Sequence, residues 1–583
     1  MKRRLLWCCL VLMLQALVWQ CGCTRSASQG MPPAPPAVGA APAPAANPAP
    51  APPSATAQIT HYDLTAGIEP AQHLLKATAR VDWEVVGRAD RLRFRLRPDL
   101  KLTALALDGV QLQYSRDREG EVTVPLPRSA EPGAKLSLTA TYGGPINGPR
   151  GGANNQRVWD YIGPEGTYVR FEAEWYPVVP GDVATADLHL TVPGGWTAVT
   201  CGELQRQEGR TFHYQVAQPA AGLSFTAAPY EVTEGQAGAV PVRCYTFPQH
   251  RQRAGNFVAG CTRILKLYER LYGPYPYPKF AIAEIPDLYG GGHGDQSFIM
   301  LQERTFAEPF NAEFVAHEMA HNWWGNLVSC TDTEFLAEGF AEYSQALWRE
   351  EQEGKRGLQA AMKEQAQAVL LASMEPTKEK SCYASDSGPF LYEKGSWILH
   401  MLRRLLGDEK WFATVKGFAV QHAGQVVTCR QLEQAFSEAY GQPLDWFIQQ
   451  WLYGKGVPWV KGEVRGATGG RATVTLTQCL ITGTGDADPG SASAAWKTKP
   501  SRFRLLVDVA VQCEGAREVR QEVWMDEPTC QVTVRVPDRP TGVVVDPDCW
   551  LLEQGKGLAG ELDAELGNLD EGLQRELQKA GVQ

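Results

Sequence analysis

The sequence has little cysteine for its length, no excess of basic residues and no long apolar run. Among its 583 residues, 14 are cysteines and none of them forms a CxxC pair, which disfavours both a disulfide scaffold and a cysteine-based zinc site. Lysine and arginine number 56 against 65 acidic residues, a net charge of -9, so nucleic-acid binding is not expected. The leading apolar run, residues 5–18, is too short to span a bilayer comfortably.

The first residues, MKRRLLWCCLVLMLQALVWQCGC, combine a basic start with that apolar run, which predicts an export signal over residues 1–23. Their end resembles the lipobox of bacterial lipoproteins. That resemblance makes Cys23 the expected site of lipid attachment, with Cys21 as a competing acceptor. Residues 24–58 are almost entirely Pro, Ala, Gly and Ser, as expected for an extended tether. We therefore expect an exported protein, periplasmic or at the cell surface, with a lipid anchor to a bacterial membrane as an open alternative.

The remaining chain changes character twice, and this predicts a multidomain α+β fold. Residues 59–235 alternate apolar and polar positions between turns, as in LRFRLRP and EVTVPLP, which predicts an antiparallel N-terminal β domain. Residues 236–460 carry mostly helical patterns, such as NAEFVAHEMAHNWWG. Strand patterns such as RATVTLTQ return over residues 461–555 and predict a C-terminal β domain, and leucines at helical spacing predict a terminal helix over residues 556–583.

The segment HEMAH is the strongest candidate for a metal site. His317 and His321 are four residues apart, so both lie on one face of a helix and can bind one ion at about 2.0–2.1 Å. Glu318 lies at the edge of that face, about a hundred degrees round the helix. It can therefore approach a water molecule on the metal as a general base without taking a coordination position.

A third ligand should come from the helix that follows. Glu338 is the best candidate, at the start of EGFAEY, with the loop 327–333 allowing it to fold back. Glu334 and Glu342 share its helix face, so periodicity alone does not choose among the three. One of the flanking acids is also a candidate for orienting a histidine through its free ring N–H.

The whole stretch HEMAHNWWGNLVSCTDTEFLAEGFAEY resembles the gluzincin zinc aminopeptidases, the family of alanyl aminopeptidase N and leukotriene epoxide hydrolase. The resemblance implies a thermolysin-like catalytic domain over residues 236–460 and one zinc ion with Glu338 as its third ligand. It also implies a catalytic role for Tyr392, in GPFLYEKGSWILHMLRRLLG. The spacing between the motifs is slightly shorter than in the family, a change that the loop 327–333 can absorb.

One family motif is missing, and it concerns the substrate. Where the family carries GxMEN, this chain has GGGHGDQ, so the motif's amine-binding glutamate falls on Gly294 and its asparagine on Asp295. TYVRFEAEWYP resembles a second family segment, in which Glu172 takes the place of another amine-binding acid. We therefore expect Glu172, Gly291, Gly292 and Asp295 to bind substrate, the glycines because they let it approach the backbone.

Together these residues predict a zinc-dependent peptidase whose partner is a peptide. A zinc ion lowers the pKa of its water towards about 7, Glu318 takes the proton, and Tyr392 donates a hydrogen bond to the oxyanion. Release of N-terminal residues is the leading interpretation. An endopeptidase, or an exopeptidase with altered end recognition, fits the missing GxMEN glutamate. A weakly active, surface-tethered peptide-binding protein is the third alternative.

Overall fold

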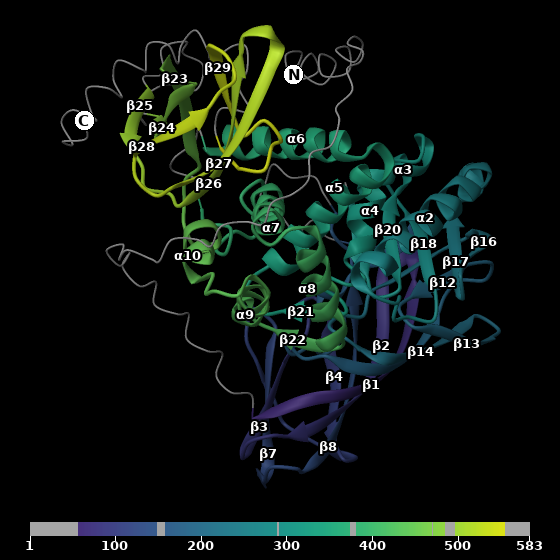
Figure 1. Cartoon of the computed structure of the whole chain (residues 1–583). Helices are drawn as coiled ribbons and strands as arrows, with labels where there is room; N and C mark the ends of the chain where they lie inside the picture. The colour runs from purple at the N-terminus through teal and green to yellow at the C-terminus, as the bar shows by residue number, and fades with distance from the viewer. Residues whose placement is uncertain are drawn as a thin grey trace. The chain divides into compact units, whose positions relative to one another are not determined.

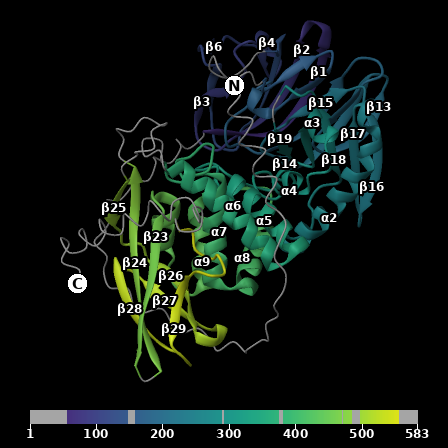
Figure 2. The same ribbon diagram turned by 90° about the horizontal axis from the view of Figure 1, so that it is seen from above.

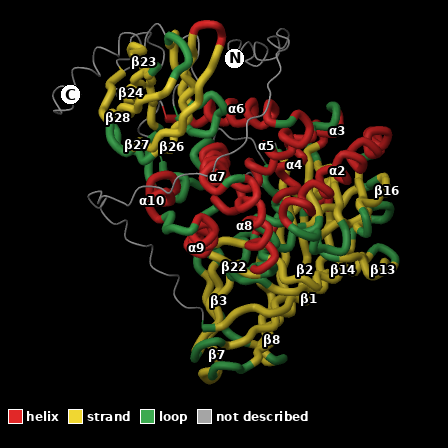
Figure 3. Tube along the Cα trace, viewed as in Figure 1, coloured by secondary structure: helices red, strands yellow, loops and turns green. Residues whose placement is uncertain are grey.

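The computed structural model describes residues 56–147, 158–288, 291–373, 380–468, 470–483 and 496–553. The export signal, nearly all of the tether and the terminal helix lie outside these residues and stay predictions. The first strand begins at Ala57, so the predicted tether 24–58 extends two residues too far. No helix in the described part of the chain is long and apolar enough to cross a membrane. Strands lie at both ends of the described sequence and helices between them (Figure 3).

The N-terminal region is built from strands with alternate side chains buried, as the period-two pattern predicted. Its two longest strands are β1 (Ala57–Glu69) and β2 (Leu74–Val85). The others are β3 (Ala89–Arg95), β4 (Lys101–Leu107), β5 (Val110–Gln111), β6 (Ser115–Arg116), β7 (Glu121–Ala130), β8 (Lys135–Pro145), β9 (Tyr161–Gly163), β10 (Gly166–Val169), β11 (Ala184–Thr191), β12 (Thr197–Thr200), β13 (Glu203–Glu208), β14 (Thr211–Ala220) and β15 (Phe225–Ala228).

Three sheets result from these strands. The largest has eight strands in the order β13-β14-β11-β1-β2-β8-β4-β5, and its neighbours pair antiparallel except for the parallel pair β1 and β11. The other two are β3-β7-β6 and β12-β15-β10-β9. The antiparallel β domain predicted from the sequence is therefore present, with one parallel pair that short-range patterns do not reveal.

A five-stranded sheet is formed mostly within the part of the chain for which the sequence indicated helices. Its strands are β16 (Glu231–Ala237), β17 (Val240–Thr246), β18 (Phe280–Ile285), β19 (Gly292–Asp295) and β20 (Phe298–Gln302), in the order β16-β17-β18-β20-β19. The central strand β18 is buried along its whole length and pairs parallel with both neighbours. A strand buried on both faces has no apolar alternation, so its sequence resembles that of a buried helix segment.

The helices of the central region pack around one hydrophobic core (Figure 1). They are α2 (Ala254–Tyr272), α3 (Glu303–Ala307), α4 (Ala312–Ala320), α5 (Phe340–Glu353), α6 (Lys355–Ser373), α7 (Tyr392–Leu406), α8 (Asp408–Gln421), α9 (Cys429–Tyr440) and α10 (Asp445–Ile448). Two short strands, β21 (Val328–Cys330) and β22 (Gln425–Val427), pair parallel between them. Five tryptophans of this core are almost fully buried: Trp323, Trp324, Trp397, Trp411 and Trp451. Such large side chains fix how the helices pack.

The C-terminal region returns to strands at Pro458, three residues before the predicted boundary at 461. The strands are β23 (Pro458–Thr468), β24 (Arg471–Gly483), β25 (Trp496–Pro500), β26 (Leu505–Cys513), β27 (Arg517–Met525), β28 (Thr529–Arg535) and β29 (Pro540–Val545). They form one sheet of β23, β24, β25 and β28 and another of β27, β26 and β29 (Figure 2). Their buried side chains belong to the same hydrophobic cluster as the helices, so this region continues the helical core.

Candidate metal centre

The helix α4 carries the HEMAH segment and is fixed at both ends by its own sequence. At its start the side chain of Asn311 accepts a hydrogen bond from the backbone N–H of Phe314 at 3.2 Å, an N-cap. The helix ends at Ala320, four residues before the end of the predicted helical pattern, and His321 is its C-cap residue. The chain then reverses through Gly325, whose φ of 106° suits glycine. His317 is thus held within a short, well-defined helix and His321 directly at its end.

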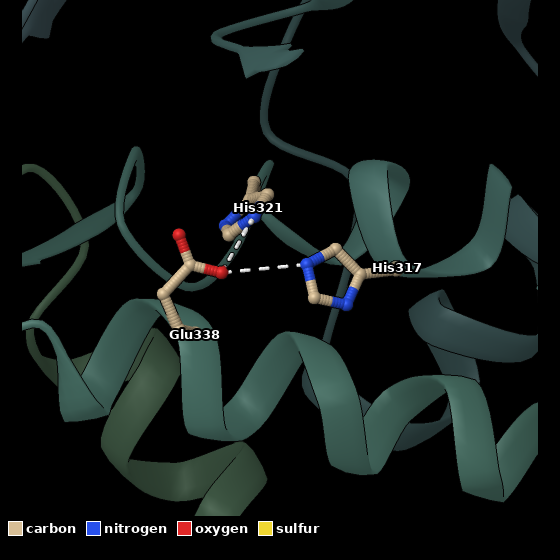
Figure 4. Close-up of side chains that lie close together, drawn as sticks. All are labelled: His317, His321 and Glu338. Atoms are coloured by element: carbon tan, nitrogen blue, oxygen red, sulfur yellow. Dashed lines mark ion pairs between the residues drawn. The ribbon is translucent and has the colours of Figure 1, made fainter. Parts of the chain in front are cut away.

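Three side chains converge in front of this helix (Figure 4). One carboxylate oxygen, Oε2 of Glu338, lies 3.3 Å from Nε2 of His317 and 3.6 Å from Nε2 of His321. All three donor atoms lie within 4.8 Å of one another. The same Glu338 oxygen is buried and accepts no well-formed hydrogen bond. Two imidazoles and a carboxylate arranged in this way suit a zinc ion, which satisfies all three groups at once.

The far nitrogens of both rings are held by acceptors, which leaves each Nε2 directed at Glu338. Nδ1 of His321 lies 3.2 Å from the carbonyl oxygen of Trp324, and Nδ1 of His317 lies 3.2 Å from Oε2 of Glu342. A carbonyl can only accept, so the Nδ1 of His321 carries the proton and its Nε2 has the free lone pair. The side-chain amide of Gln365 donates to the other oxygen of Glu342 at 2.9 Å. The sequence did not indicate Gln365.

The three acids that helix periodicity left open take different places. Glu338 lies in a π-helical turn, Phe335–Gly339, directly before α5 and faces both rings. Glu342, one turn later, contacts the outer side of His317. Glu334 lies before the turn, and its carbonyl accepts the backbone N–H of Glu338 at 2.9 Å. Burial would raise the pKa of Glu338, but the facing His321 and His317 and a hydrogen bond from Tyr392 lower it to about 2. Glu338 is therefore an ionised acceptor.

The strand β19 crosses α4 closely at two glycines. A Cβ at Gly292 would lie 2.5 Å from Oε1 of Glu318, and one at Gly294 would lie 2.5 Å from the Glu318 carbonyl oxygen. Glu318 is 6% exposed, and this burial raises the pKa of its carboxyl. Gly294 is thus required for the close approach of the α4 backbone, whereas a side chain at Gly292 would displace the carboxylate of Glu318. Gly291, just before the strand, accepts a backbone hydrogen bond from Gln302 at 3.3 Å.

Tyr392 is the first residue of α7 and lies beside His317. Its ring lies 5.9 Å from the ring of His317, at an interplanar angle of 23°. The helix α7 reaches this position through a contact between two glycines, because a Cβ at Gly395 would lie 2.9 Å from the Cα of Gly339. Gly339 follows Glu338 directly, so this contact sets the distance between Tyr392 and the carboxylate.

The residues expected to bind substrate gather around His293. Its Nε2 lies 3.3 Å from Oδ2 of Asp295 and 3.8 Å from Oε2 of Glu172. Asp295 is only 1% exposed, and its other oxygen accepts from the hydroxyl of Ser224 at 2.9 Å, whereas the side chain of Glu172 is 40% exposed. Burial lowers the pKa of His293, but Asp295 and Glu172 outweigh it and raise this pKa to about 9. The imidazole is therefore cationic at neutral pH.

Sequence reasoning did not foresee this arrangement of His293. The histidine lies in a glycine-rich segment that also suits an ordinary tight turn, and Glu172 is more than a hundred positions away in the chain. The pairing of histidine and acid at alternate positions, HGD, is the one local signal that could have indicated it, because alternate residues of a strand share a face.

The fold and the site together define a class of protein, the thermolysin-like zinc hydrolases. Their features are a mixed sheet, a helix that carries HExxH and a glutamate ligand from the next helix. Residues 258–451 match the family model described as Peptidase family M1 domain. The predicted resemblance to the zinc aminopeptidases is confirmed.

Among the relatives, aminopeptidase N of Lactococcus lactis subsp. lactis is 30% identical over 228 residues, which are 35% of this chain and 26% of the relative. Aminopeptidase 2 of Candida albicans is 27% identical over 354 residues, 56% of this chain and 37% of the relative. The chain thus spans about a quarter to just over a third of the length of these relatives.

A crystal structure of an M1 zinc metallopeptidase variant from Deinococcus radiodurans, bound to a Tyr-Ser-Ala substrate, has a similar fold. The TM-score is 0.58 with 20% identity, and the match covers 69% of this chain and 95% of the other. This likeness confirms the predicted multidomain α+β fold with a thermolysin-like region.

Proposed function

We propose that the protein is a zinc-dependent aminopeptidase that binds one zinc ion and releases N-terminal residues from peptides. The observation that carries the proposal is the convergence of His317, His321 and Glu338, in which one carboxylate oxygen faces both Nε2 atoms. Zinc bound there would activate a water molecule and polarise the peptide carbonyl. The named activities of the relatives in other organisms support the choice of aminopeptidase.

The protein's own residues then move the protons and stabilise the developing charge. Glu318, buried beside the ligands, accepts the proton of the attacking water and passes it to the leaving amine. The hydroxyl of Tyr392 donates a hydrogen bond to the oxyanion of the scissile carbonyl. Glu172 is the acid through which the proposed site holds the substrate's α-amine, because its side chain is 40% exposed whereas Asp295 is buried. Asp295 is buried beside His293, so it acts through the imidazole of that residue.

Paired peptides test the proposal. One peptide of each pair has a free N-terminus and the other is acetylated, and both are incubated with the enzyme before and after treatment with a chelator. We expect chelator-sensitive cleavage of the free peptides alone. The Glu318→Gln variant should retain stoichiometric zinc, measured by elemental analysis, and lose hydrolysis, because it keeps the ligands and removes the base. A fully active Glu318→Gln variant, or activity untouched by the chelator, would overturn the proposal.

A second candidate, a peptidase with altered end recognition, is favoured by one observation. The cationic His293 lies between the two acids expected to attract a substrate amine. The imidazole offsets part of the negative charge of these acids. The site therefore excludes an acetylated or internal peptide segment less strongly than two acids alone would. Cleavage of acetylated peptides as fast as of free ones would select this candidate.

A substitution separates the two candidates further. If Glu172 holds the α-amine, His293→Gln removes a competing cation, and the preference for free over acetylated peptides, measured as kcat/KM, should rise roughly tenfold. Gln249→Ala, an exposed polar change on another element, serves as the control. An unchanged preference in His293→Gln would favour the altered peptidase.

A further inference from the structure

A second cluster of reactive side chains links the loop between the two metal-binding segments to the start of α9. It consists of Cys330, Asp332 and Cys429, whose donor atoms all lie within 4.8 Å of one another. Cys330 ends β21 and Cys429 begins α9, and the two segments are joined by the parallel pairing of β21 with β22, in which Cys330 is opposite Val427. Residues about a hundred positions apart are therefore held side by side by backbone hydrogen bonds.

Asp332 holds the two thiol-bearing segments together. Its Oδ1 accepts the S–H of Cys330 at 2.8 Å. The backbone N–H of Cys429 lies 3.3 Å from Oδ1 and 3.2 Å from Oδ2 of the same carboxylate, which caps the first turn of α9. Both oxygens of Asp332 thus already accept hydrogen bonds from the two segments. The arrangement suits a bond between the thiols better than a metal site.

We propose that Cys330 and Cys429 form a disulfide that fastens the loop between HEMAH and Glu338 to α9. Cys330 is half-buried and therefore reachable by a reagent, whereas Cys429 is buried. Closing the gap to an S–S bond of about 2.0 Å requires the two side chains to rotate towards each other, within the reach of paired neighbouring segments. The nearby Cys382 is fully buried, and its thiol contacts the carbonyl oxygen of Leu391 at 3.8 Å.

The reaction is thiol–disulfide exchange with a low-molecular-weight disulfide such as oxidised glutathione. The thiolate of Cys330 attacks one sulfur of the reagent, which forms a mixed disulfide and releases one thiol. The thiolate of Cys429 then attacks the Sγ of Cys330 and releases the second thiol. Two protein thiols become one disulfide, and one reagent disulfide is reduced to two thiols.

The crosslink would act on the region that carries the metal site. It encloses residues 330–429, which include Glu338 and Tyr392. A crosslink over so long a segment restricts the unfolded chain and so stabilises the folded one. The oxidised protein should therefore unfold at a higher temperature than the reduced protein.

Peptide mapping of the folded full-length protein tests this directly. The protein is incubated with oxidised or reduced glutathione, its free thiols are alkylated under denaturing conditions, and the digest is analysed by mass spectrometry without reduction. We expect a linked pair of peptides containing Cys330 and Cys429 only after oxidation. The midpoint of thermal unfolding should rise by several degrees on oxidation and return on reduction.

Variants provide the controls. Cys330→Ser and Cys429→Ser should each lose the linked peptides and the thermal response, whereas Cys530→Ser, which removes the half-buried thiol of β28, should keep both. Complete alkylation of both cysteines after oxidation would overturn the proposal. So would a link from either one to Cys382, or protection from alkylation that needs added zinc and leaves no crosslink. The map of the unaltered protein decides the question even where a variant fails to fold.

Discussion

Tyr392 shows how one hydroxyl can be tested apart from the metal. It is hydrogen-bonded to Glu338 and lies against the ring of His317, so its position depends on the ligands but it is not one of them. We expect Tyr392→Phe to lower kcat about a hundredfold, about 3 kcal/mol of transition-state stabilisation, with little change in KM. Steady-state kinetics with a free peptide measures both constants. Tyr440→Phe, a half-buried tyrosine at the end of α9, should change neither. A rise in KM at constant kcat would contradict the role.

Lys279 is a buried amine whose titration should be visible in stability. It is 4% exposed and donates to the carbonyl oxygens of Thr200 and Ser297 at 2.9 and 3.3 Å. Burial lowers its pKa to about 7, against about 10.4 in an unfolded chain. At a pH between these two pKa values, Lys279 is protonated in the unfolded chain and neutral in the folded chain. The free energy of unfolding contributed by Lys279 therefore rises with pH.

The comparison with Lys279→Met isolates this contribution. From about pH 7 to about pH 9 the unaltered protein should gain about 2 kcal/mol more stability than the variant. Denaturant titrations at several pH values measure the difference. The buried tyrosines, whose pKa values are raised, contribute equally to the stability of both proteins, so their effect cancels. Parallel stability curves would show that Lys279 does not titrate in this window.

At the scale of elements, the glycine contact between α7 and the turn that carries Glu338 sets the geometry of the site. A Cβ at Gly395 would lie 2.9 Å from the Cα of Gly339, a backbone atom that cannot rotate away. We expect Gly395→Ala to lower the free energy of unfolding by about 1–3 kcal/mol and to weaken zinc retention, because it separates the two segments. Chemical denaturation and chelator competition measure these effects.

The same substitution in a neighbouring helix provides the control. Gly417 lies in α8, and a Cβ there would meet nothing within 4 Å. Gly417→Ala should therefore be neutral or stabilising by up to about 1 kcal/mol, since alanine favours a helix. Equal destabilisation by both variants would mean that the close contact with Gly339 does not explain the loss.

The sequence predicted elements well where a periodic pattern decides them. Histidines at i and i+4 fixed the face of α4, and alternation fixed β1 and β2. It missed the buried strand β18, which has no polar face, and the early end of α4. Helix periodicity left the third ligand open, because it places Glu334, Glu338 and Glu342 on one face. It does not show which side of the histidines each acid reaches. That difference arises from how the π-helical turn packs on α4.

At the scale of the whole molecule, the C-terminal strands were predicted as a domain of their own, and their attachment to the helices could not be foreseen. Sequence patterns report which face of a strand is buried, and they do not report what covers it. In the structure, Nε2 of His400 in α7 is hydrogen-bonded to the carbonyl oxygen of Cys549 at 2.9 Å. The His400 ring also stacks on the ring of Trp550, with the ring centroids 4.5 Å apart. Since strands and helices share one core, we expect them to unfold together.

An ion pair across this boundary allows the coupling to be measured. Arg404 of α7 donates to both carboxylate oxygens of Asp508 in β26 at 2.8 and 3.0 Å, and the two side chains are 21% and 17% exposed. A double-mutant cycle with Arg404→Met and Asp508→Leu should give a coupling of roughly 1–2 kcal/mol, between the values of surface and buried pairs. Either single change leaves a charge half-buried near the boundary, so the double variant should be less destabilised than the sum of the two.

An exposed pair within the C-terminal region sets the baseline for this cycle. Arg502 and Glu527 lie 2.9 Å apart, but their side chains are 68% and 55% exposed. Their cycle should give below about 0.5 kcal/mol, because solvent screens the charges. The shared core would not act as one cooperative unit if the effects of the Arg404 and Asp508 changes simply added, as expected for the exposed pair. The same would follow if the C-terminal strands unfolded in a separate transition from the helices. A single transition with a measurable coupling is the result expected when β26 and α7 stabilise each other.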